Sequence, residues 1–346
     1  MALPHTVAAA VIISDCIDEN ARVRQQCRFA SLFSIEPSYI GVSSTHPELE
    51  AAGHLVDVLD AHRLMTPSSS GNSTPIQSSL SKLANASHNQ KDASSPFTAV
   101  IIVNVAPRTE SIKKRWGNGP PFCFFAISGV LVVSTYSQLI LSLLFRILKR
   151  ENNASLPQIH VMKTQAVIQH AANQNWIPLD EANRIINTQF RSYEFVPLAA
   201  YWIVTRGGSS AIPHDLASIL EKEGQDQCEQ EHQEEGKRNN QADDKSLNPF
   251  IWFIDNFGNC KTSLLPEDID FMENRIYSVT LENNQSLIIK ACGIKRLSDA
   301  VPLVPTVLVG SSGYKNYRFL ELVIKNDNFS NKTRASIGPF SISLDT

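Results

Sequence analysis

The feature that most constrains the fold of this chain is a change of pattern between its two parts. In the first 205 residues, apolar strand-like runs alternate with segments of helical periodicity. This alternation predicts an α/β domain with a mainly parallel sheet, because each helix carries the chain back to the edge where the next strand begins. The predicted strands are residues 7–14, 39–43 and 99–105, and the predicted helices are residues 20–33 and 48–61.

After residue 250 the chain has short strand-like runs that follow one another closely. Such spacing is typical of a small all-β domain, here predicted to be barrel-like. The predicted strands are residues 251–254, 276–281, 286–292, 306–309 and 320–324. We therefore predict an α/β nucleoside-binding domain over residues 1–205 and a β-rich domain over residues 249–346.

Two polar tracts interrupt these patterns. Residues 66–96 are dense in Ser, Asn and Pro and contain few large apolar side chains, so they cannot bury enough surface to become ordered. Residues 206–248 begin with Gly and Ser and continue with an excess of acidic side chains. We interpret the first tract as a disordered insertion and the second as an acidic linker or insertion between the domains.

One stretch, residues 122–145, carries no charge and is followed by basic residues, as a membrane-spanning helix often is. Against a span, it contains Ser128-Gly129 and a second polar group at residues 134–138, which would be unfavourable in lipid. The stretch divides instead into a strand, a turn and an amphipathic helix. We favour this interpretation and keep a membrane anchor as the alternative.

Composition narrows the class of partner. The formal net charge is -3, which favours neither nucleic acid nor an anionic membrane surface. The six cysteines are scattered, without the spacing of a metal site. No basic residue precedes the first apolar run, so no targeting signal is evident. We expect a cytoplasmic protein that binds a small molecule, with no metal, no nucleic acid and no membrane as partner.

Polar residues at the ends of predicted strands form the candidate site. The commoner catalytic motifs, such as phosphate-binding glycine loops and the nucleophile elbow, are absent from the sequence. Ser14 and Asp15 follow the first strand, where open α/β sheets gather their ligands.

In the second domain, an apolar strand is followed directly by a polar bend. Asp255 and Asn259 bracket this bend, and Gly258 can adopt the positive φ that it requires. These side chains and Phe257 could converge on one ligand. The simpler interpretation is that Asp255 and Asn259 only form a turn.

Taken in order, these clusters resemble motifs of the S-adenosyl-L-methionine (SAM) hydroxide adenosyltransferases and of the related SAM-dependent fluorinases and chlorinases. The resemblance is patchwise over most of the chain. It is carried by Ser14-Asp15, by Ile254-Asp255-Asn256-Phe257-Gly258-Asn259, by Ser311-Ser312-Gly313-Tyr314 and by Phe195-Val196-Pro197-Leu198-Ala199-Ala200.

The resemblance implies an architecture and a reaction. It implies a homotrimer, with each site lying between the first domain of one subunit and the second domain of a neighbour. Water or halide would attack C5′ of the ribose and methionine would leave, with the protein aligning the reactants and desolvating the nucleophile. No cofactor is implied, because SAM is itself the substrate.

The resemblance also implies residue roles on the adenosine side of SAM. Asp15 would accept hydrogen bonds from the ribose hydroxyls, which suits a carboxylate. Phe257 would pack on the adenine, and Asn259 would hydrogen-bond its edge.

On the methionine side, Asp255 would face the ammonium group. Ser311 and Ser312 would meet the carboxylate, and Tyr314 belongs to the same segment, which closes the site.

Two positions depart from the family pattern. Members that use water carry an Asp where this chain has Ala106 and a His where it has Phe190 or a neighbour. Neither an alanine nor a phenylalanine can transfer a proton. Two hypotheses follow: a divergent SAM-cleaving enzyme whose catalytic residues are unknown, or a catalytically silent SAM- or adenosine-binding scaffold that keeps the fold.

Overall fold

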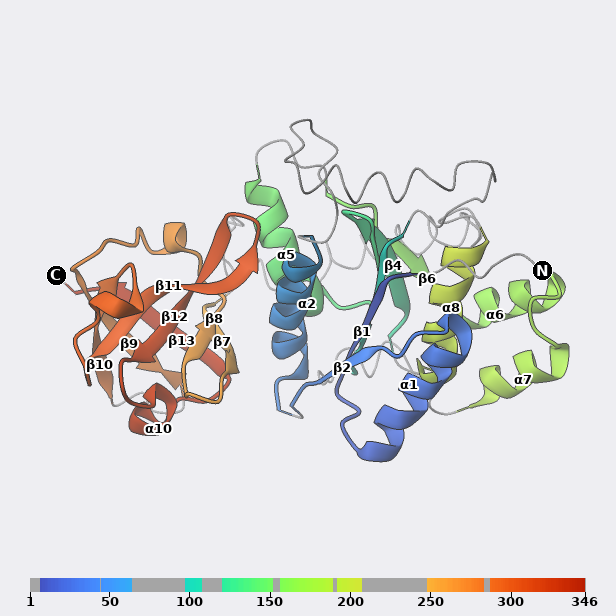
Figure 1. Cartoon of the computed structure of the whole chain (residues 1–346), viewed down its shortest axis with the longest axis horizontal. Helices are drawn as coiled ribbons and strands as arrows, with labels where there is room; N and C mark the ends of the chain where they lie inside the picture. Colours follow the sequence, from blue (N-terminus) through green and yellow to red (C-terminus); the bar gives the residue numbers. More distant parts are fainter. Residues whose placement is uncertain are drawn as a thin grey trace, which may run out of the picture.

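The structure, a computed structural model of the chain, shows two domains side by side. An α/β domain occupies the right of Figure 1 and a β-barrel the left, with α2 and α5 between them. The two predicted insertions, residues 66–96 and 206–248, lie almost entirely outside the described residues. The structure describes residues 7–43, 45–63, 97–107, 120–151, 156–188, 192–206, 248–282 and 287–345.

A six-stranded sheet forms the centre of the α/β domain, in the order β2-β1-β3-β5-β4-β6. Strands β1, β2, β3 and β5 are parallel, and β4 is antiparallel to both of its neighbours. The central strands β3 and β5 are buried throughout, as expected when helices cover both faces. The mainly parallel α/β prediction is thus confirmed. The strands are β1 (Ala9–Ser14), β2 (Ser38–Gly41), β3 (Ala99–Asn104), β4 (Phe122–Ile127), β5 (Val130–Thr135) and β6 (His160–Met162).

Helices pack on both faces of this sheet. On one face α1 packs against α8, with Phe29 and Trp202 in a shared core, and on the other α2 packs against α5. Asp18 caps the N-terminus of α1, where its side chain accepts a hydrogen bond from the Ala21 amide at 2.9 Å. The helices are α1 (Glu19–Phe33), α2 (Pro47–Arg63), α5 (Gln138–Arg150), α6 (Thr164–Asn173), α7 (Leu179–Asn187) and α8 (Ser192–Thr205).

Residues 122–145 form two strands joined by a tight turn and then the start of a helix, so the predicted strand, turn and helix are present and β5 is a further strand that the sequence analysis did not separate. Strands β4 and β5 are paired by a turn in which Ser128 and Gly129 both have positive φ, 49° and 76°. Helix α5 follows and buries the apolar side that includes Leu144 and Ile147. Among the described helices, none is both long and apolar enough to cross a membrane.

The second domain is a closed barrel of seven strands, in the order β10-β11-β12-β8-β7-β13-β9. This confirms the predicted barrel-like architecture. Its interior is filled by side chains such as Ile251, Tyr277 and Leu322. The strands are β7 (Phe250–Ile254), β8 (Cys260–Thr262), β9 (Ile276–Leu281), β10 (Ile288–Ile294), β11 (Pro305–Tyr314), β12 (Tyr317–Ile324) and β13 (Gly338–Leu344), and a short helix, α10 (Phe329–Thr333), precedes the last of them.

The two domains meet along α2, which contacts both β7 and β11. Trp252 of β7 is fully buried and lies directly over Gly53, where a Cβ would come within 2.1 Å of the indole ring. His54 packs edge-on against Trp252 and Phe253. A glycine is therefore required at position 53 because the barrel approaches the helix backbone so closely.

Charged groups of α2 complete this domain interface. Asp57 accepts hydrogen bonds from the Ser312 hydroxyl at 2.9 Å and the Gly313 amide at 3.0 Å, and Lys261 lies 3.3 Å from it. Asp60 accepts from Arg318 Nη1 at 2.7 Å. The end of the β11–β12 hairpin is thus held on α2 by several charge-assisted hydrogen bonds.

Candidate functional site

The carboxyl edge of the N-terminal sheet holds Asp15, directly after β1. From β1 the chain continues to β2, which lies on one side of β1 in the sheet. From β3 it continues to β4 and β5, which lie on the other side, so the strand order reverses between β1 and β3. Asp15 Oδ2 accepts a hydrogen bond of 3.3 Å from the Ala106 amide, which follows β3, across this point. Ligands of open α/β sheets bind in the crevice at such a switch point.

Polar side chains of β3, α1 and β2 form a hydrogen-bond network beside Asp15. Asn104, the last residue of β3, donates to Gln25 Oε1 of α1 at 3.1 Å, and Gln25 donates to the Tyr39 hydroxyl at 3.2 Å. Tyr39 in turn donates to the Cys16 carbonyl at 2.7 Å. Because Gln25 and Asn104 are buried, these bonds connect the end of β3 to the Cys16 backbone, next to Asp15.

Burial keeps the groups beside Asp15 uncharged. It raises the pKa of the Cys16 thiol; a hydrogen bond with Tyr193 acts against this rise, and the Asp15 carboxylate adds to it. Burial likewise raises the pKa of Tyr39 and of Tyr193. Cys16 is therefore a protonated thiol at neutral pH, and it lacks the thiolate that nucleophilic catalysis requires.

Two positions, Ala106 and Phe190, depart from the motifs of the SAM-cleaving enzymes, and the structure describes the first of them. Ala106 lies at the sheet edge and contributes its backbone amide to Asp15. Its methyl group cannot accept a proton from water. Phe190 lies outside the described residues. Among the described residues, no group of three or more His, Cys, Asp or Glu side chains is placed to hold a metal ion.

The predicted bend forms at Asp255, and donors from within the bend bind both oxygens of the Asp255 carboxylate. Oδ1 accepts from the amides of Phe257 at 2.8 Å and Asn259 at 2.9 Å, and Oδ2 accepts from Asn259 Nδ2 at 3.0 Å. Gly258 has φ of 81°. Asp255 and Asn259 therefore do form a turn, as the simpler interpretation of the sequence expects.

The same bend presents one large apolar side chain to solvent. Phe257 is 77% exposed, so its ring is available for stacking. The Gly258 carbonyl accepts from the amide of Ser330 in α10 at 3.0 Å. The predicted adenine contacts of Phe257 and Asn259 stay predictions.

The other predicted residues of the barrel mostly face α2. Ser312, which is 2% exposed, donates to Asp57, and Tyr314, which is 1% exposed, shares a hydrogen bond of 3.1 Å with Ser128. Ser311 is exposed, and its amide donates to Glu321 at 3.3 Å. Alternation along β11 thus directs Ser312 and Tyr314 into the domain interface, where they bind the first domain of their own chain.

Sequence reasoning missed the polar residues that support the Asp15 edge. Asn104 offered a signal, since it is the polar end of a strongly apolar strand. Gln25 and Tyr39 offered none, because each lies within a helical or strand-like pattern of its own and they meet only in the folded domain.

Comparison with known proteins defines a class by fold alone: a two-domain protein with an α/β domain and a closed barrel. No family model matches the sequence, and no curated protein matches it. A solved structure described as an uncharacterized conserved protein from Thermotoga maritima is 12% identical, with a TM-score of 0.50 over 97% of this chain and 100% of that chain. A conserved hypothetical protein from Thermus thermophilus is also 12% identical, with a TM-score of 0.44 over 98% of this chain and 100% of that one. The first likeness shows a shared fold.

Proposed function

We propose that this protein binds SAM with its ribose at the carboxyl edge of the N-terminal sheet and cleaves it at C5′. The observation that carries the proposal is the position of Asp15 at the switch point between β1 and β3. An ionised carboxylate has two oxygens and about four lone-pair positions, so it can accept both ribose hydroxyls besides the Ala106 amide and the Cys16 thiol.

The reaction is a substitution in which one bond forms and one breaks. Water or halide attacks C5′, the C5′–sulfur bond breaks, and the electron pair leaves with methionine as a neutral thioether. When water is the nucleophile, its proton passes to solvent. Alignment of the nucleophile with the departing sulfur supplies the rate enhancement, because the sulfonium is already a good leaving group.

Binding without cleavage is the second candidate, and Ala106 specifically favours it. No proton acceptor stands at this position, and the loss of such a group costs orders of magnitude in rate while ground-state binding persists. A silent SAM- or adenosine-binding scaffold would keep the Asp15 edge and lose turnover.

Calorimetry with SAM and with adenosine, followed by chromatography of each mixture for adenosine and methionine, separates the candidates. Products support the enzyme, and binding without products supports the scaffold. No binding of either compound would refute both.

A charge-neutralising pair of variants tests the role of Asp15. Asp15→Asn keeps an oxygen for the Ala106 amide but removes the charge, so it should weaken adenosine binding at least about tenfold, since hydrogen bonds to charged groups contribute about 1.5–3 kcal/mol. Glu36→Gln makes the same change at an exposed position before β2, at the opposite edge of the sheet, and should leave affinity unchanged. Equal affinity in both variants would show that Asp15 does not hold the ligand.

A further inference from the structure

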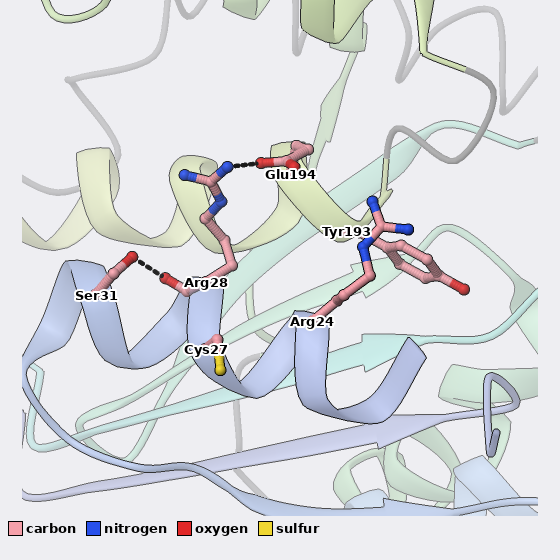
Figure 2. Close-up of a pocket in the computed structure, with 6 residues that line it drawn as sticks. All are labelled: Arg24, Cys27, Arg28, Ser31, Tyr193 and Glu194. Atoms are coloured by element: carbon pink, nitrogen blue, oxygen red, sulfur yellow. Dashed lines mark hydrogen bonds and ion pairs between the residues drawn. The ribbon is translucent and has the colours of Figure 1, made fainter. Parts of the chain in front are cut away.

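A second concave site lies outside the Asp15 edge, between α1 and α8. This α1–α8 groove has a volume of about 300 Å³ and is lined by polar and charged side chains from the two helices. Figure 2 shows the guanidinium groups of Arg24 and Arg28, one helical turn apart, both directed from α1 toward α8. The lining residues are Arg24, Cys27, Arg28, Ser31, Tyr193 and Glu194.

Positive charge exceeds negative charge among the residues that line the groove, which include two arginines and one glutamate. Glu194, the one carboxylate among the lining residues, forms an ion pair with Arg28 and also lies 3.6 Å from Arg184. Arg184 is further paired with Glu181 at 2.7 Å. Arg28 and Arg184 thus share the carboxylates of Glu194 and Glu181, and neither of these carboxylates forms an ion pair with Arg24.

Arg24 is held in place without an acidic partner of its own among the described residues. Its guanidinium carbon lies 5.2 Å from the centroid of the Tyr193 ring, a cation–π contact. Arg24 is exposed, so the hydrogen-bond donors of its guanidinium are accessible to a ligand. Arginine is the residue best suited to bind phosphate or carboxylate oxygens through two parallel hydrogen bonds.

We propose that the α1–α8 groove binds a small oxyanion, the phosphate or carboxylate group of a small molecule. Arg24 is the principal ligand, and Arg28 adds positive charge while it remains paired with Glu194. The volume lies at the lower end of the range for small-molecule sites, which favours a compact anion over a protein segment. Tyr193 separates this groove from the Asp15 edge, because its ring faces Arg24 and its hydroxyl group interacts with Cys16.

Titration of the full chain with inorganic phosphate, followed by calorimetry, tests the proposal. Arg24→Gln should weaken phosphate binding about tenfold, since it removes one charge-assisted ligand. Arg22→Gln is the matched control, because Arg22 lies on the same helix, is similarly exposed and pairs with Glu19 at 3.0 Å outside the groove. This control should bind phosphate within about twofold of the wild type.

Three outcomes would overturn the proposal. These are no measurable binding of either phosphate or acetate to the wild-type chain, equal binding by wild type and Arg24→Gln, and an equal loss in Arg24→Gln and Arg22→Gln, which would indicate non-specific attraction to a basic surface. Acetate in place of phosphate identifies the preferred oxyanion, and an Arg24-dependent signal with either one supports the site. Adenosine should not displace the anion, so the result is independent of the function proposed for Asp15.

Discussion

The carboxyl edge of the N-terminal sheet and the polar segments of the barrel were comparable candidates in the sequence, yet the fold uses them differently. At the edge, a buried network orients the backbone around Asp15, and the amide of Ala106 reaches it at 3.3 Å. In the barrel, Asp255 binds the atoms of its own bend, and Ser312 binds α2. A polar side chain after a strand is therefore a strong ligand candidate where the topology opens a crevice, and a weaker one where a turn or a neighbouring domain satisfies it.

The largest effect is expected where the barrel approaches α2 most closely. Gly53→Ala would place a Cβ within 2.1–2.5 Å of the Trp252 ring, so the domains must separate or the indole must move. We expect a loss of about 3 kcal/mol in the free energy of unfolding, despite the higher helix propensity of alanine. Urea denaturation measures it.

Gly41→Ala is the control, because the Cβ there would meet only the Ile17 side chain, at 2.8 Å, and Ile17 is exposed and can move. If both variants were equally stable, α2 and the barrel would not be packed as described, and the structural role assigned to the barrel residues would fail.

A pH-dependent effect of about 2 kcal/mol is expected from His54, which lies in the same interface. Burial lowers the pKa of His54 from 6.5 to about 4, with Asp57 acting against the shift and Lys261 with it. The unfolded chain takes up a proton as the pH falls below about 6.5, whereas the folded chain does not until about 4. The contribution of His54 to the free energy of unfolding is therefore fully present above pH 6.5. It falls by about 2 kcal/mol between pH 7 and pH 5.

His54→Phe isolates that contribution. The variant keeps an aromatic ring against Trp252 and Phe253 but cannot titrate. Its unfolding free energy, measured by urea denaturation at pH 7 and pH 5, should fall less than that of the wild type by this amount. Identical pH dependence in the two proteins would show that folding does not lower the pKa of His54.

Asp255 distinguishes a structural role from a ligand role most directly. Asp255→Ala removes the acceptor of three hydrogen bonds within the bend and should lower stability by about 1.5 kcal/mol. Asp255→Asn keeps an oxygen for the two amides and should lose less. Thermal unfolding of both variants checks this order. A large loss of SAM affinity in Asp255→Asn without loss of stability would instead show that the charge binds the methionine ammonium, and the contrast between edge and barrel would fail.

Much of the fold followed from periodicity. Strand β3 is an apolar run that is buried throughout, and the Ser128-Gly129 turn argued against a membrane span, although the pairing of β4 with β5 in a hairpin appears only in the structure. The antiparallel direction of β4 within a parallel sheet follows from that short turn. The closure of the barrel through β13 did not follow, because pairing between β13 and β9 depends on contacts between residues far apart in sequence, such as Phe340 with Leu281.

The site could be predicted only in part for a related reason. The strand end at Asp15 and the turn at Asp255 are local features, and both are present in the structure. Ser312 is buried against Asp57, which is 255 residues earlier in the chain, so no local pattern around either residue reveals the contact. A local motif shows which polar groups a segment contains, whereas the tertiary structure determines whether these groups bind a ligand or another part of the protein.

The smallest effect expected is that of Ser312→Ala. It removes the hydroxyl that donates to Asp57, while Asp57 keeps the Gly313 amide and Lys261, so the loss in unfolding free energy should be about 1 kcal/mol. Ser311→Ala is the matched control at the adjacent, exposed position and should be close to neutral in urea denaturation. If Ser311→Ala lowered SAM affinity while Ser312→Ala changed only stability, Ser311 would bind the ligand and Ser312 would stabilise the domain interface. The solvent-facing side of β11 would then belong to the ligand-binding surface together with the Asp15 edge.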